Sequence, residues 1–200
     1  MRGGLFNIGA EGQLYIGALA AVSVSLIHLP SPLHLIVALL AAMVAGMLWS
    51  LPVAILKLTR GVHEVISTIM FNWIAHFFAF YMIANVLTDP IRGEKTISIA
   101  ETSRFARILP GSSLNYGIVV AVIAALLVLF LLWRTTAGFE LRVAGHNPES
   151  AHYAGISRRK QVLRAFLIGG VLAGLAGAVQ VMGRPPTYAL VTGMSQVANL

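Results

Sequence analysis

The chain has 200 residues, of which 58% are hydrophobic and only 10% are charged. Soluble domains carry roughly 25% charged residues, so this composition predicts a protein embedded in a lipid bilayer. The formal net charge of +7 would favour nucleic acid as a partner of a soluble protein. Here the basic residues lie in loops between apolar stretches, where membrane orientation explains them, and no nucleic-acid partner is expected. The absence of cysteine excludes a disulfide framework and a thiolate metal site.

Five apolar segments are long enough to cross the hydrocarbon core, which needs roughly 20 residues. They predict an all-α, polytopic membrane helix bundle with about five transmembrane helices, formed by residues 1–200 as a single domain. The expected spans are Leu5–Leu29, Leu33–Leu56, Val62–Leu87, Asn115–Trp133 and Ala165–Met182.

A polar stretch, Arg134–Arg164, separates the fourth and fifth expected spans and holds six of the fourteen basic residues. A short basic loop between spans is expected on the cytoplasmic side. The alternation of spans then puts Met1 and the KLTRG turn (57–61) inside, and HLPSPLH (28–34) and Thr88–Ser113 outside. The basic residues of the loop are Arg134, Arg142, Arg158, Arg159, Lys160 and Arg164.

The same loop carries signals for a short helix of its own. Asn147 is a good N-cap, Pro148 suits the first helical position, and Glu149 favours the positive end of the helix dipole. Gly155 is a natural stop, so a helix is predicted over Pro148–Ala154. Such a helix would give a partner protein a defined surface to bind. The alternative is a surface turn that merely joins two spans.

Polar residues interrupt the first expected span. At 100° per residue Asn7, Glu11 and Tyr15 share one helix face, while Gln13 points elsewhere. Glycines in this segment permit close packing or a break in the helix. One interpretation is a broken helix beside a substrate path, and the other is an interfacial Glu11 that extends to water.

A second polar stripe runs along the third expected span, at Glu64, Thr68, Asn72 and His76. Because polar groups in hydrocarbon are costly, this face should look into the bundle or a water-filled route. Hydrogen bonding between helices is the alternative. Together with Asn7 and Glu11, these four residues form the predicted translocation path.

The fifth expected span contains Gly170 and Gly174 at GxxxG spacing, followed by Gly177, which predicts a close-packing face. The sequence has no P-loop and no GxSxG elbow, and the residue four after His63 is Ser67, so no HExxH pair forms. We therefore expect no catalytic residue, no metal site and no cofactor.

Three motifs resemble the permease subunit of a bacterial ABC importer, in the family that serves ribose, branched-chain amino acids and nucleosides. They are FNIGAEGQLYIGALAA (6–21), GVHEVISTIMFNWIA (61–75) and AGHNPESAHYAGI (144–156). The first two are most similar to the nucleoside branch. The resemblance implies a multi-pass protein of the bacterial inner membrane, without enzymatic activity of its own. Its implied partners are cytosolic ABC ATPases, a second permease subunit, an extracytoplasmic substrate-binding lipoprotein and the lipid bilayer.

The resemblance also implies that the loop supplies a coupling helix that docks on the ATPase. Ala151 and Ala154 would let it seat in a cleft, and Tyr153 and Ile156 would provide apolar anchors. The full set of coupling positions carried over is Gly145, Asn147, Pro148, Ala151, Tyr153, Ala154, Gly155 and Ile156.

Members of that family carry further spans before the first motif and after the fifth span, so we expect the chain to be incomplete at both ends. Two other functions remain as alternatives. An ion-coupled secondary transporter of a small polar solute would use Glu11 and Glu64 as proton or cation sites. A membrane-embedded enzyme would use His63 or His76, but the scattered histidines lack metal spacing.

Overall fold

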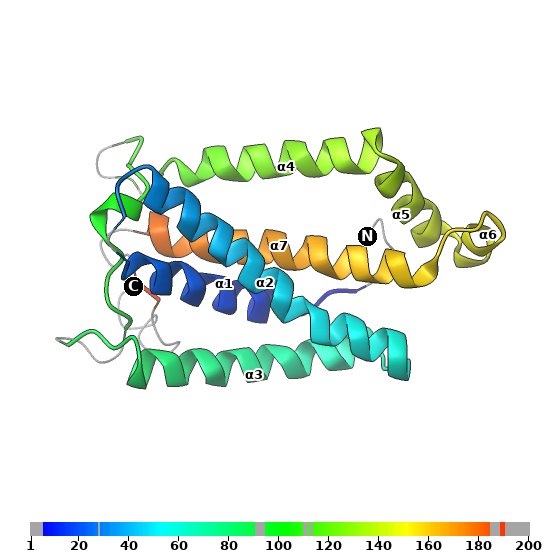
Figure 1. The fold of residues 1–200 in the computed structure, drawn as a ribbon, viewed down its shortest axis with the longest axis horizontal. Helices are drawn as coiled ribbons and strands as arrows, with labels where there is room; N and C mark the ends of the chain where they lie inside the picture. The colour runs from blue at the N-terminus through cyan, green and yellow to red at the C-terminus, as the bar shows by residue number, and fades with distance from the viewer. Residues whose placement is uncertain are drawn as a thin grey trace.

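The computed structural model describes residues 6–27, 29–90, 95–109, 112, 114–184 and 189–190. Within these ranges the chain is a bundle of helices, with isolated bridges only at Thr88–Thr96 and Arg107–Asn115 (Figure 1). The predicted all-α fold is confirmed. In order, the helices are α1 (Ala10–Ser25), α2 (Leu33–Arg60), α3 (Glu64–Asn85), the 3-10 helix η1 (Glu101–Ser103), α4 (Gly117–Arg134), α5 (Thr136–His146), α6 (Pro148–Tyr153) and α7 (Arg158–Gly183).

Four of the described helices, rather than five, have the length and composition to cross a membrane: α2, α3, α4 and α7. The first expected span, Leu5–Leu29, is too long. Its helix α1 has 16 residues, about 24 Å, because the described residues before Ala10 are not helical. The Asn7 carboxamide accepts a hydrogen bond from the Gly9 amide at 3.1 Å, which turns the chain just before the helix. The helix α7 begins seven residues earlier than expected, at Arg158.

The core of the bundle is the trio α1, α2 and α7, which make the most extensive contacts in the chain. Glycines let their backbones touch. A Cβ placed on Gly17 would lie 2.5 Å from the backbone of Gly174, and one on Gly170 would lie 2.5 Å from the Gly46 carbonyl oxygen. Gly177 meets the Leu14 carbonyl in the same way. The predicted close-packing face on the fifth span is confirmed, and it serves two neighbours at once.

The helices α3 and α4 flank this trio on opposite sides (Figure 1). Thr68, Ala75 and Ala79 are buried on the side of α3 that packs towards the trio. In contrast, α4 has a single buried residue, Gly117, and leaves an apolar groove of about 620 Å³ between itself and α7. The trio and α3 therefore form a packed unit, and α4 stands beside it.

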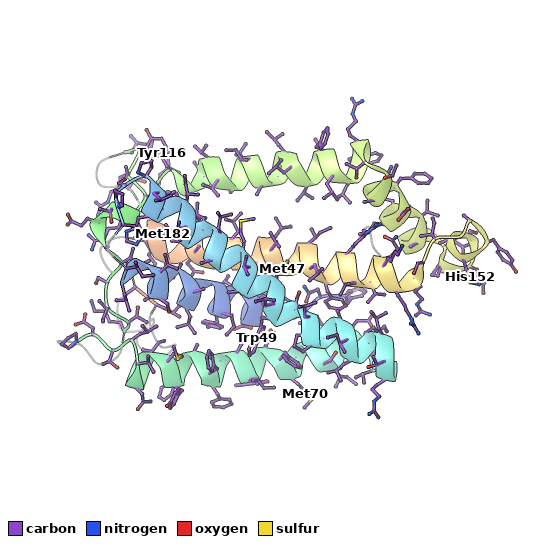
Figure 2. The ribbon with its side chains drawn as sticks, viewed as in Figure 1. Met47, Trp49, Met70, Tyr116, His152 and Met182 are labelled. Carbon is purple, nitrogen blue, oxygen red and sulfur yellow. The ribbon has the colours of Figure 1, made fainter. Side chains whose placement is uncertain are left out.

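The connections lie at two opposite ends of the bundle. One end, here called the α6 end, holds α5, α6, the start of α7, the end of α2 and the start of α3 (Figure 1). The opposite end holds η1 and the start of α4; Figure 2 shows His152 and Tyr116 at these two ends. The turn 57–61 and the loop 134–164 thus share one end, as the predicted alternation requires. The expected position of Met1 lies outside the described residues.

The described residues between 95 and 116 lie over the end of the bundle opposite α6. The Ala100 amide donates to Ser25 Oγ at 2.7 Å, and the buried His34 ring bonds the Thr102 hydroxyl at 2.7 Å. The Asn115 side-chain amide donates to the Gly183 carbonyl at 2.7 Å. These contacts tie the longest connection of the described chain to the ends of α1, α2 and α7.

Candidate functional site

The connection between α4 and α7 is almost entirely helical, whereas the sequence predicts only one short helix there. The helix α5 fills its first half. Thr135 caps α5: its hydroxyl accepts from the Gly138 amide at 3.1 Å and donates to the Leu131 carbonyl at 2.6 Å. The signal for α5 was a threonine N-cap followed by helix-forming residues, which the polarity of the segment masked.

The predicted short helix is confirmed as α6. The Asn147 Oδ1 atom accepts hydrogen bonds from the amides of Glu149 at 3.0 Å and Ser150 at 3.1 Å, and Pro148 occupies the first helical position. Two amides that a helix start leaves without partners are therefore satisfied by one side chain. The cap fixes where α6 begins and how the chain enters it from α5.

The end of α6 is equally defined. Gly155 has a φ of 75°, its amide bonds the His152 carbonyl at 3.0 Å, and the Ile156 amide bonds the Ala151 carbonyl at 2.9 Å. This pair of bonds is the Schellman motif, which needs a left-handed residue after the helix. A residue with a side chain would pay roughly 1–2 kcal/mol for that conformation. Glycine thus lets α6 stop sharply and lets the chain turn back into α7.

The exposure of α6 divides the predicted coupling residues into two groups. Tyr153 is 91% exposed and points away from the bundle, and Ala154 and Gly155 beside it are also exposed. Ala151 is only 3% exposed, because it faces the rest of the chain. Its expected contact with a partner's cleft stays a prediction; within the described chain the Ala151 side chain is buried on the inner side of α6. The remaining positions lie at the edges of α6: Asn147 and Pro148 are exposed, and Gly145 and Ile156 are half-buried.

A carboxylate braces α5 against α7. The Glu140 Oε2 atom accepts from Arg164 Nη1 at 2.6 Å and from Gln161 Nε2 at 2.8 Å. The hydrogen bond from Arg164, and next the one from Gln161, hold the pKa of Glu140 below its ordinary value. A cavity of about 740 Å³ remains between α5, α6 and α7, and the buried Gln161 Oε1 atom has no hydrogen-bond partner in the part of the chain that the structure describes.

The start of α1 lies inside the bundle, where two asparagines satisfy its polar groups. The Asn72 Oδ1 atom accepts from the Gly12 amide at 2.9 Å, and its Nδ2 atom donates to the Ile8 carbonyl at 2.9 Å. The carboxamides of Asn7 and Gln13 bond each other at 3.2 Å. Asn7 therefore does not share a helix face with Glu11, and Gln13, which was expected to point elsewhere, is buried as its partner.

The predicted stripe on α3 splits into residues with different surroundings. The buried Thr68 hydroxyl donates to the Glu64 carbonyl at 2.7 Å, and the Glu64 carboxylate pairs with Lys57 Nζ at 2.5 Å. Asn72 bonds α1, so the interpretation as hydrogen bonding between helices holds for this residue. His76 packs edge-on against Tyr15, with ring centroids 5.8 Å apart. Only Glu11 and His76 of the predicted path are left at an accessible edge without a hydrogen bond in the described chain.

The family described as "Branched-chain amino acid transport system / permease component" matches residues 1–196. The chain belongs to this permease family. It is a multi-pass membrane protein, in agreement with the four span-length helices.

The chain is similar to several named permeases. It is 45% identical over 188 residues to the guanosine ABC transporter permease protein NupP of Bacillus subtilis, covering 91% of this chain and 53% of that protein. It is 33% identical to the nucleoside ABC transporter permease protein NupB of Lactococcus lactis, covering 100% and 57%. The glucose ABC transporter permease protein TsgB13 of Haloferax volcanii is 34% identical, with 92% and 51% covered. The chain thus spans about half the length of these relatives. No solved structure matches it.

The chemistry of the described permease residues is that of packing, capping and a few polar contacts. Among them no group of three or more His, Asp and Glu residues could hold a metal ion. Near the α6 end, two ion pairs join neighbouring helices: Lys57–Glu64 and Arg164–Glu140. The arrangement presents a capped, exposed helix at the α6 end and polar groups where α1 meets α3.

Proposed function

We propose that this chain is the permease subunit of an ATP-driven importer of nucleosides in a bacterial inner membrane. ATP hydrolysis takes place on separate cytosolic subunits, which dock on α6. A second permease chain, identical or related, completes the pore. A binding lipoprotein delivers the substrate to the opposite end of the bundle.

The observation that carries this proposal is the construction of α6. A six-residue helix that merely joined two spans would need neither a bidentate N-cap nor a Schellman stop. Its tip presents a nearly fully exposed tyrosine, Tyr153, of the kind that anchors protein interfaces. The neighbouring excess of basic residues favours the cytoplasmic side for this end.

The choice of substrate is supported by similarity. The relatives named for guanosine and nucleosides include the one with 45% identity, while the relative named for glucose is 34% identical. A sugar is therefore the nearest competing substrate class. Direct uptake of radiolabelled guanosine and glucose into cells that carry the complete transporter separates the two.

The role of α6 is tested by Gly155→Arg. The new side chain occupies the docking surface and strains the helix stop, so nucleoside uptake should fall more than tenfold while the chain still reaches the membrane. Gly61→Arg is the matched control: Gly61 also has positive φ, 65°, lies at the same end, and has open space around it. Normal uptake by Gly155→Arg at normal expression would contradict the coupling role.

An ion-coupled secondary transporter remains the second candidate because Glu11 lies exposed on α1 without a described hydrogen-bond partner. Glu64 supports it less, since Lys57 already neutralises its charge. The two mechanisms differ in energy source. Uptake that collapses with an uncoupler but survives loss of the ATPase subunits would favour the ion-coupled carrier and exclude the ABC mechanism.

A further inference from the structure

An aromatic edge beside an acidic side chain lies along the contact between α1 and α3. It consists of Glu11, Tyr15, Trp73, His76 and Phe77, and is called here the α1–α3 edge. The His76 ring lies 5.8 Å from Tyr15, 6.0 Å from Trp73 and 5.8 Å from Phe77, measured between centroids. Trp73 and Phe77 are 60% and 65% exposed. Glu11 precedes Tyr15 by one helical turn on α1.

This edge lies within the membrane-spanning part of the bundle. The Gly12 amide of α1 donates a hydrogen bond to Asn72 of α3. Asn72 lies eight residues, about 12 Å, from the start of α3 at Glu64, so the first turn of α1 lies at that depth. Figure 1 shows α1 starting well inside the bundle rather than at its end. Glu11 is therefore a carboxylate at membrane depth, and such groups mark solute pathways when no structural partner explains them.

The two acidic residues of the span region have opposite surroundings. Glu64 is buried and forms an ion pair with Lys57. Glu11 is exposed, and the described residues give it neither a hydrogen bond nor an ion pair. Exposed aromatic rings alone would suit contact with lipid, but lipid tails do not solvate a carboxylate. The combination fits a ligand with a flat ring and hydrogen-bond donors on its edge.

We propose that the α1–α3 edge contacts the base of a 6-oxopurine nucleoside, such as guanosine, during translocation. This inference rests on the proposed function and specifies its substrate. Guanine presents two neighbouring donors, N1–H and the 2-amino group, which match the two oxygens of the Glu11 carboxylate. The exposed rings of Trp73 and Phe77 offer faces on which a base can stack. Adenine presents an acceptor at N1 and would place it against the carboxylate.

The test is the ratio of guanosine to adenosine uptake, as kcat/KM, in cells that carry the complete transporter. Glu11→Gln replaces one acceptor oxygen by a donor, so the ratio should fall about tenfold or more, mostly through guanosine. Glu101→Gln, an equally conservative change at the opposite end where the side chain is 91% exposed, should leave the ratio unchanged. An unchanged ratio in Glu11→Gln, or an equal loss of both substrates, would overturn the inference.

A second measurement does not depend on Glu11. Because the sequence has no cysteine, Trp73→Cys introduces a single thiol on the edge. Saturating guanosine should slow its reaction with a water-soluble thiol reagent at least severalfold, and adenosine should protect less. Equal reaction rates with and without guanosine would overturn the proposal. If the unmodified transporter took up no nucleoside, the proposed function itself would fail, which is a different result from uptake with an unchanged ratio.

Discussion

The trio α1–α2–α7 and the arm α4–α5–α6 are held by different interactions. In an apolar stretch of 18 residues taken from each helix, 44% of the residues are buried in α7 and 6% in α4. The trio is joined by direct backbone contact at glycines, in particular Gly17, Gly46 and Gly174. The arm is joined by hydrogen bonds of individual side chains, namely the caps Thr135 and Asn147 and the Glu140 brace.

We therefore expect the trio to be more rigid than the arm. Where the backbones touch directly, no flexible side chain lies between them that could rearrange, so the trio resists deformation. An element with few buried contacts moves at lower cost, and the capped α6 keeps its own shape as it does so.

The strongest effect should come from Gly174→Ala in the trio. The new Cβ meets backbone atoms of α2, which cannot move aside as a side chain can, so the free energy of unfolding should fall by about 2–3 kcal/mol. Gly169→Ala is the matched control on the same helix, since its Cβ meets only the Asn7 side-chain amide. Thermal unfolding in detergent measures both. Equal stability of the two variants would contradict the glycine packing.

The next effect concerns the ion pair that joins α2 to α3. Lys57→Met leaves the Glu64 carboxylate, 11% exposed, without its partner, and should cost about 1–3 kcal/mol of stability. The double variant Lys57→Met with Glu64→Gln removes the unpaired charge and should recover most of the loss. The same unfolding measurement applies. A double variant as unstable as the single one would show that the pair does not stabilise the contact.

In the arm, Asn147→Ala should weaken α6 by about 1 kcal/mol, because the amides of Glu149 and Ser150 lose their acceptor. Amide hydrogen exchange at these two residues should speed up about fivefold, while global stability stays the same. Asn147→Asp retains an acceptor and should exchange like the original chain. Identical exchange in the Ala and Asp variants would mean that the cap does not hold α6.

The smallest effect is the pH dependence of the Glu140 brace. Since the pKa of Glu140 is lowered in the folded chain, its stabilisation is fully present above the ordinary value of 4.5 and is lost as pH falls from there through the lowered value. Exchange in α5 should therefore rise, relative to α7, only below about pH 4.5. Glu140→Gln should abolish this pH dependence. A dependence that persists in that variant would assign it to another group.

The features predicted correctly from sequence are those that depend on residues close together in the chain. Asn147, Pro148 and Gly155 define α6 through bonds to residues at most five positions away. The Gly170–Gly174 spacing predicts a packing face because both residues lie on one side of a single helix.

The errors have the opposite origin. The Gly12 amide in the first turn of α1 bonds the Asn72 side chain, 60 residues away, and no local pattern encodes that contact. The pairing of Asn7 with Gln13 contradicts an angular argument that assumed a continuous helix. The helix α5 was missed because its polarity resembled a loop, although Leu141 is buried. The sequence also could not show that Tyr153 is exposed whereas Ala151 is buried, although both are predicted coupling residues.

The central claim is that α6 faces the cytosol and meets a separate ATPase there. Because the sequence lacks cysteine, Tyr153→Cys in α6 and Tyr116→Cys just before α4 each provide one exposed thiol, at opposite ends of the bundle (Figure 1). A membrane-impermeant thiol reagent applied to intact spheroplasts should label Cys introduced at Tyr116 and not at Tyr153, and inverted vesicles should give the reverse. Labelling of the Tyr153→Cys variant in intact spheroplasts would place α6 outside the cell, beyond reach of any ATPase, and would contradict the account.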